Sequence, residues 1–113
     1  MQFMLLLHDD EAAWTGLSED RQMAIVGEHM AYSDELQTAG AFVSGAALDP
    51  AGSAKIVTGS GIQDGPYADT KEQLGGFYLI EAASMAEAVE WAGKCPAAKT
   101  GKVEVRPVPD YGG

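Results

Sequence analysis

Residues 2–8, which read Gln-Phe-Met-Leu-Leu-Leu-His, decide the fold of this chain. The run is short and apolar, and the acidic segment 9–11 (Asp-Asp-Glu) follows it, a pattern that predicts a buried strand and its exit. Because side chains alternate along a strand, one face would carry Phe3, Leu5 and Leu7, and the other Met4 and Leu6. Helices on one side of a small sheet cover only one of these faces, so a second copy of the chain is the simplest cover for the other.

Further helices and strands follow this first strand. Ser18 is a suitable N-cap and Gly40 a suitable stop for a long helix, and Ser84 with Glu87 forms a capping box for a second one. The expected elements are a helix over 18–39, a strand over 41–48, a hairpin arm at 55–58, a surface loop over 59–76, a strand over 77–81, a helix over 84–95, a strand over 103–108 and a tail over 110–113. This order predicts the ferredoxin-like α+β fold (βαββαβ with an added hairpin arm), an antiparallel sheet with two helices on one face.

Length and composition fit one soluble domain over residues 1–113. The net charge of -10 argues against nucleic acid and anionic lipid as partners. The longest apolar run near the N-terminus, residues 3–7, is far shorter than the roughly 20 residues of a membrane span, and no basic residue precedes it. The only cysteine, Cys95, cannot form an internal disulfide, which favours a cytoplasmic setting.

The first helix carries Met23, Val26 and Met30 at the spacing i, i+3, i+7, and Ile25 and Leu36 widen this stripe on one side. The pattern predicts an amphipathic helix whose stripe lies on the sheet. On a helical wheel His29 falls inside the apolar arc, about 40° from Ile25, and we expect it to be partly buried. An imidazole in such a place can act as a general base, although a semi-buried histidine is more often only a hydrogen-bonded part of the structure.

The central segment 64–81 reads Asp-Gly-Pro-Tyr-Ala-Asp-Thr-Lys-Glu-Gln-Leu-Gly-Gly-Phe-Tyr-Leu-Ile-Glu. Together with segments 10–14 (Asp-Glu-Ala-Ala-Trp), 95–98 (Cys-Pro-Ala-Ala) and 103–108, it makes the chain resemble the YCII-related proteins, and more narrowly their DGPF branch. Tyr67 stands where the name-giving Phe of that branch would be. The resemblance implies a homodimer in which two ferredoxin-like sheets close face to face into an α+β barrel.

The same resemblance bears on activity. In the broader family a histidine on the first helix and an aspartate just after the second helix have been proposed as an acid/base pair, and one relative in aromatic degradation eliminates halide from a ring. His29 falls at the histidine position, whereas Cys95 occupies the aspartate position before a proline. Burial as a packing residue is the favoured interpretation of Cys95, because a helix C-terminus disfavours a thiolate.

The long loop holds a second group of polar residues. Asp64, Tyr67, Lys71 and Glu72, beside Asp69, could orient a small ligand. Alternatively, Asp64 fixes the Asp-Gly-Pro turn by accepting backbone hydrogen bonds, and Lys71 and Glu72 pair with a partner subunit. His8, just before the acidic segment 9–11, is a further candidate for ligand binding. A metal site is disfavoured there, because no second well-spaced histidine accompanies it and an acidic solvated turn is the simpler interpretation.

These features lead to two functional hypotheses. The first is an uncharacterised YCII-related protein that binds a small polar or aromatic molecule, in the barrel or under the 59–76 loop, and supports proton transfer or elimination with His29 as base. It needs no cofactor. The alternative is a non-catalytic ligand-binding or regulatory interaction module, because relatives of this branch occur beside sigma factors of the extracytoplasmic-function type.

Overall fold

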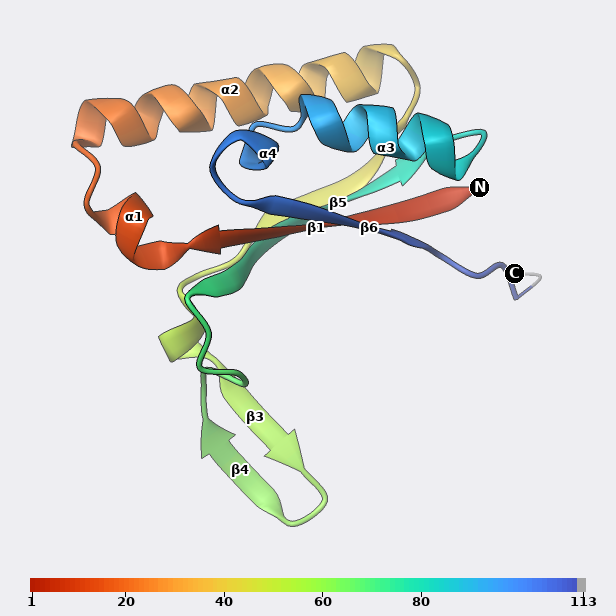
Figure 1. The fold of residues 1–113 in the computed structure, drawn as a ribbon. Coiled ribbons are helices and arrows are strands. Elements are labelled where there is room, and N and C mark those ends of the chain that lie inside the picture. The colour runs from red at the N-terminus through yellow and green to blue at the C-terminus, as the bar shows by residue number, and fades with distance from the viewer. Residues whose placement is uncertain (112–113) are drawn as a thin grey trace.

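The computed structural model describes residues 1–111, so the last two residues of the predicted 110–113 tail lie outside the described part. Strands and helices follow one another in nearly the expected order (Figure 1). The elements are β1 (Gln2–Asp10), α1 (Glu11–Thr15), α2 (Glu19–Thr38), β2 (Phe42–Ala47), the 3-10 turn η1 (Ala51–Ser53), β3 (Lys55–Thr58), β4 (Gly61–Asp64), β5 (Glu72–Glu81), α3 (Met85–Lys94), α4 (Ala97–Thr100) and β6 (Lys102–Pro107).

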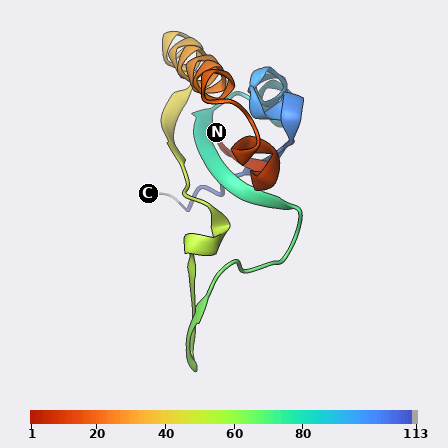
Figure 2. The same ribbon diagram turned by 90° about the vertical axis from the view of Figure 1, so that its left-hand side faces the viewer.

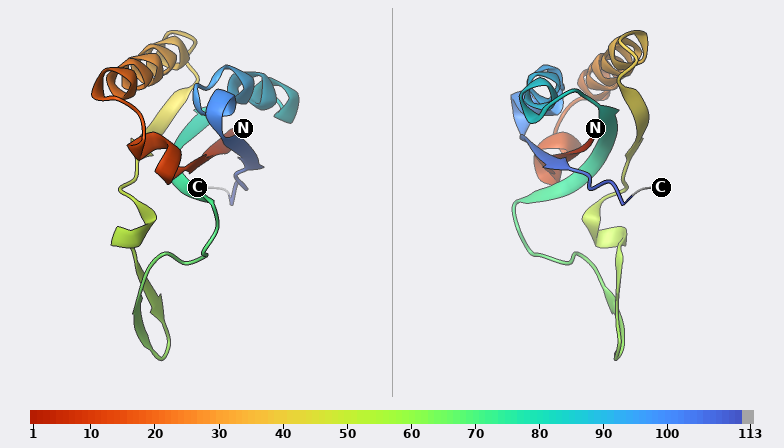
Figure 3. Two further views of the ribbon diagram at one scale, coloured as in Figure 1. Left: turned by 60° about the vertical axis from the view of Figure 1, so that its left-hand side comes forward. Right: turned by 90° about the vertical axis from the view of Figure 1, so that its right-hand side faces the viewer.

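Four strands form the main sheet in the order β2-β5-β1-β6, and every pairing is antiparallel. Helices α2 and α3 lie on the same side of this sheet, as the two turned views show (Figure 2; Figure 3). This is the predicted ferredoxin-like arrangement, with β1 in the interior of the sheet. Within residues 1–111, no helix is long and apolar enough to cross a membrane.

The alternation predicted for the first strand separates the two faces of the sheet. Phe3, Leu5 and Leu7 are buried under the helices and form the centre of the core. The opposite face carries Met4 and Leu6 on β1, and β5 places Leu79 and Phe77 directly across from them. These four side chains are half-buried and lie outside the core cluster, so the apolar face without helices is present as predicted.

Helix α2 begins and ends where the sequence predicts. The Ser18 hydroxyl accepts a hydrogen bond from the Arg21 amide, and Gly40 has a positive φ of 73°, a conformation that glycine adopts without steric cost. The prediction that Met23, Val26 and Met30 lie on the sheet is wrong, because all three are exposed. The residues that were predicted to widen the stripe do face the sheet: Leu36 is buried and Ile25 is half-buried. Together with the buried Tyr32 they mark the core side of the helix, roughly 120° from the exposed residues on the wheel.

The loop predicted over 59–76 is shorter than expected. Residues 61–64 pair with β3 to form a separate two-stranded hairpin, and β5 begins at Glu72 instead of residue 77. The anchoring role predicted for Asp64 is also wrong. Its exposed carboxylate forms an ion pair with Lys55 across the hairpin, and the turn is held instead by a backbone hydrogen bond from Gly65 to the Ala54 carbonyl.

Two short helices were not predicted. The acidic segment 9–11, expected as a solvated turn, begins α1, because the Asp10 carboxylate accepts hydrogen bonds from the amides of Ala12 and Ala13. Helix α4 follows Pro96 and precedes β6. The predicted capping box at Ser84 is confirmed: the Glu87 amide donates to the Ser84 hydroxyl, and the Glu87 carboxylate accepts from the amide of Ala83.

Candidate functional site

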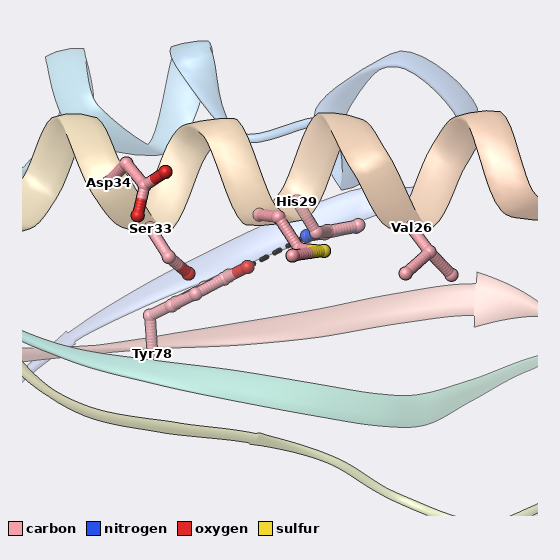
Figure 4. Close-up of a pocket in the computed structure, with 6 residues that line it drawn as sticks. Val26, His29, Ser33, Asp34 and Tyr78 are labelled. Carbon is pink, nitrogen blue, oxygen red and sulfur yellow. Dashed lines mark hydrogen bonds between the residues drawn. The ribbon is translucent and has the colours of Figure 1, made fainter.

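A histidine and a tyrosine meet between α2 and the sheet. His29 Nδ1 and the Tyr78 hydroxyl are hydrogen-bonded at 2.8 Å, and their rings are stacked with an interplanar angle of 16° (Figure 4). His29 comes from the middle of α2, and Tyr78 comes from β5, where strand alternation turns it toward the helices. The structure therefore pairs the predicted candidate base with a hydroxyl group from a different element.

A cavity of about 260 Å³ opens beside this pair. Helix α2 and β5 together supply its lining, which consists of Val26, His29, Met30, Ser33, Asp34 and Tyr78. Val26 and Met30 are largely exposed, so they form an apolar mouth, whereas His29 and Ser33 are half-buried. The cavity thus combines an apolar entrance with polar groups at the histidine–tyrosine pair (Figure 4).

The surroundings keep both groups of the pair uncharged at neutral pH. Burial lowers the pKa of His29 below its ordinary 6.5, and the nearby carboxylates of Glu28 and Asp9 only partly oppose this shift. Burial also raises the pKa of Tyr78, against a smaller lowering by the Ser33 hydroxyl. A neutral imidazole in a partly buried cavity is a competent proton acceptor.

Glycine at position 45 makes room for the tyrosine. Gly45 lies opposite Tyr78 in the pairing of β2 with β5. A Cβ atom at this position would approach Tyr78 Cδ1 to 3.0 Å and the Phe77 carbonyl oxygen to 3.1 Å. The absence of a side chain on β2 therefore lets the Tyr78 ring lie flat enough for its hydroxyl to reach His29.

Cys95 does not line this cavity and does not replace the aspartate of the acid/base pair that the family resemblance implied. The thiol is buried as predicted, and burial raises its pKa, so it is protonated at neutral pH. The proximity of Cys95 also contributes to the raised pKa of two phenols, those of Tyr32 and Tyr78. Within residues 1–111 no hydrogen bond joins it to His29. Tyr78, and not Cys95, is the hydrogen-bonding partner of the histidine.

A second, more polar cleft of about 660 Å³ gathers three of the predicted ligand-binding residues, His8, Lys71 and Glu72. The other residues that line it are Asp10, Ala13, Thr70, Thr100 and Lys102. Its charges are already paired inside the chain. Lys102 contacts Glu72, Lys71 lies 3.9 Å from Asp10, and His8 Nε2 lies 3.0 Å from Glu104.

The two remaining predicted ligand-binding residues lie apart from both cavities. Asp64 is paired with Lys55 at the base of the β3–β4 hairpin. Tyr67 is 87% exposed and lines neither cavity. Within residues 1–111, no group of three or more His, Cys, Asp or Glu side chains is arranged to hold a metal ion.

The sequence did not single out Tyr78 as the partner of His29. Its pattern predicts an aromatic of the core or interface, one of a group of which some must line any pocket between helices and sheet, although a tyrosine on the covered face of a strand needs a partner for its hydroxyl. That need, combined with the semi-buried His29 predicted on the helix above the sheet, is the signal that could have found the pair. No sequence pattern indicated that Ser33 and Asp34 line the cavity.

Three similarities to known proteins accompany this geometry. The family described as the YCII-related domain matches residues 1–111. An uncharacterised protein of Rhizobium meliloti (strain 1021) is 34% identical over 98% of this chain and 94% of its own length. A solved structure with a TM-score of 0.59 is 5-chloro-2-hydroxyhydroquinone dehydrochlorinase from Burkholderia phenoliruptrix AC1100, in complex with 2,5-dihydroxybenzoquinone. It shares 18% identity over 96% of this chain and 94% of that one, a likeness that concerns the fold.

Proposed function

This chain belongs to the YCII-related domain family, and from that premise we propose that it binds a small aromatic or polar molecule in the His29–Tyr78 cavity, with His29 as general base. The observation that carries the proposal is the 2.8 Å hydrogen bond between His29 Nδ1 and the Tyr78 hydroxyl at the wall of a cavity. A base held by a second group in an accessible pocket is the arrangement that general acid–base chemistry requires.

The proposed chemistry uses one of the two tautomers that this hydrogen bond allows. If Nδ1–H donates to the Tyr78 oxygen, Nε2 keeps its lone pair for the ligand. The reaction then moves a proton from a ligand hydroxyl or C–H group to Nε2, which leaves an imidazolium and a ligand anion. Glu28 and Asp9, which raise the pKa of His29, stabilise that imidazolium. On a substrate with a leaving group such as halide, expulsion of that group would complete an elimination.

The lining favours a flat aromatic ligand with a weakly acidic hydroxyl group. Val26, Met30 and the Tyr78 ring offer apolar surface, and 260 Å³ exceeds the roughly 150 Å³ of an engineered cavity that accepts benzene. The structural relative named above was solved in complex with 2,5-dihydroxybenzoquinone, which is also a flat six-membered ring with acidic hydroxyl groups. The polar cleft is the weaker candidate, because both of its lysines already contact carboxylates.

Binding of 4-nitrophenol tests this proposal, because its phenolate absorbs visible light and its neutral phenol does not. We expect the protein to bind the probe and to increase its phenolate fraction near the pKa of the free probe, because the imidazolium formed by proton transfer pairs with the bound phenolate and this pairing offsets the lowered pKa of His29. His29→Gln should abolish the increase. His8→Gln, in the polar cleft, is the matched control and should leave it unchanged.

The outcomes separate the functional hypotheses. Loss of the signal in His8→Gln, or no binding at all, would contradict the assignment of the cavity. Binding without deprotonation would remove the catalytic role and favour the alternative, a non-catalytic ligand-binding module.

We further propose that the chain functions as a homodimer. The support is the sheet face that carries Met4, Leu6, Phe77 and Leu79, which no helix of residues 1–111 covers. A face-to-face pairing of two sheets with two-fold symmetry would bury the same apolar surface on both copies.

A further inference from the structure

The hairpin formed by β3 and β4, here called the arm (residues 55–64), stands apart from the rest of the fold. Its two strands form a separate two-stranded sheet and pair only with each other. In every view the arm extends away from the helices, past the open face of the main sheet (Figure 1; Figure 2; Figure 3). An isolated two-stranded hairpin is marginally stable in water, so this arm requires a surface to rest on.

One face of the arm is suited to an apolar contact. Val57 and Ile62 lie directly opposite each other, and their side chains are 72% and 71% exposed. Lys55 and Asp64 form an ion pair at the base of the arm, so residues 55–64 carry no net charge. The arm can therefore approach an acidic surface without repulsion.

A matching surface lies on α2, the helix stripe of Met23, Val26 and Met30. These side chains are 67%, 50% and 66% exposed, and the same stripe supplies the apolar mouth of the His29–Tyr78 cavity. Contiguous exposed apolar surface marks interaction sites more often than chance. Helix α2 also carries five acidic residues and one arginine. Another acidic surface would be repelled by this helix, whereas the uncharged arm would not.

The arm cannot meet the stripe of its own chain, because the sheet lies between them (Figure 1). If a second copy packs on the open face, its sheet lies about 10 Å from the sheet of the first copy. Its helices lie about 10 Å beyond that second sheet. Each strand of the arm has four residues and spans about 13 Å at roughly 3.3 Å per residue. The turn at its tip and the segment that joins it to the main sheet lengthen this reach, so the arm extends past the partner's sheet toward its helical layer.

We propose that the arm of one copy lies on the helix stripe of the second copy and closes the mouth of that copy's His29–Tyr78 cavity. Each ligand site would then be completed by Val57 and Ile62 of the other copy. The inference rests on the proposed homodimer and on the cavity as the ligand site, and it makes dimerisation a condition for ligand binding.

Disulfide trapping between two different variants tests this contact without any ligand. A chain with Val57→Cys is mixed with a chain with Val26→Cys, dissociated, reassociated and oxidised. We expect a disulfide-linked product that contains one copy of each and has about twice the 11.8 kDa mass of the chain. The natural Cys95 is buried and should not react.

Val89→Cys on α3 is the matched control, since Val89 is 52% exposed and Val26 is 50% exposed. The Val57→Cys chain should link to it at least about tenfold more slowly, because a disulfide needs Cα atoms within roughly 7 Å. Equal or faster linking to the α3 variant, or linking only between two arms, would overturn the inference. Because trapping needs no ligand, a failed nitrophenol experiment with successful trapping would reject the proposed function and leave the contact standing.

Discussion

His29 differs from an ordinary surface histidine because burial lowers its pKa below 6.5. The base is active only when neutral, so the rate of any proton transfer to His29 should rise with pH through this lowered pKa and level off below the pH at which a free histidine loses its proton. An NMR titration of the His29 ring measures this pKa directly. A His29 pKa at or above 6.5 would contradict the burial of the pair.

The same shift should make stability depend on pH. Above pH 6.5 the imidazole is neutral in both the folded and the unfolded chain and contributes no pH dependence. As the pH falls from 6.5 to the lowered folded pKa, the unfolded chain binds the proton first, so the free energy of unfolding should decrease. His29→Gln should lack this decrease in urea unfolding at successive pH values, and an identical pH profile would contradict it.

Gly45 is the residue on which the position of Tyr78 depends. Gly45→Ala would place a methyl group 3.0 Å from the Tyr78 ring, closer than an ordinary contact, so the ring or the strand has to shift by a few tenths of an ångström. We expect a loss of about 1 to 3 kcal/mol in unfolding free energy, together with weaker nitrophenol deprotonation. Denaturant unfolding measures the stability, and 4-nitrophenol measures the deprotonation. A Gly45→Ala protein that deprotonates the probe as well as the unchanged protein would show that the position of Tyr78 does not depend on Gly45.

At the scale of elements, α2 contains a glycine that the structure does not need. Gly27 is exposed, and a Cβ atom there would have no neighbour within 4 Å. Gly27→Ala should therefore raise the free energy of unfolding by about 0.5 to 1 kcal/mol, through the lower conformational entropy of alanine in the unfolded chain. The variant is also the control for Gly45→Ala, since it should leave the probe signal unchanged. A destabilised Gly27→Ala protein would indicate that another molecule covers this side of α2.

Element positions were more predictable than the orientation of α2. Ser18 and Gly40 carry local signals for helix ends, which tertiary contacts did not override. The side of α2 that faces the sheet was only partly predicted. Leu36 is buried as expected, whereas Met23, Val26 and Met30 are exposed, because a sequence pattern does not separate a core side from an exposed apolar side. The hairpin of β3 and β4 was only half predicted, since residues 61–64 carry few apolar side chains.

The candidate site also contains features that the sequence predicted and features that it did not. His29 was predicted to be partly buried from its wheel position, and its half-buried place beside a cavity confirms that location. Its contact with Tyr78 joins residues 49 positions apart, so it depends on how α2 lies across β5 and not on local sequence. Asp64 and Tyr67 were grouped with Lys71 and Glu72 by proximity in the chain, whereas the hairpin separates them in space.

At the scale of the whole molecule, two copies should be the stable species. The face that carries Met4, Leu6, Phe77 and Leu79 has no helical cover within the described residues, and its exposure would oppose a stable monomer. Light scattering at micromolar concentration should give about twice 11.8 kDa. Leu6→Glu should shift the protein toward monomer, whereas a native-like monomer of the unchanged chain would contradict the dimer.

A crystal structure of the protein soaked with 4-nitrophenol tests the central claim most directly, because it locates the ligand independently of any reaction. The account predicts the ring between the helix stripe and Tyr78, with the phenol oxygen about 3 Å from His29 Nε2. Ligand density in the polar cleft beside His8, Lys71 and Glu72, with the His29–Tyr78 cavity empty, would contradict it.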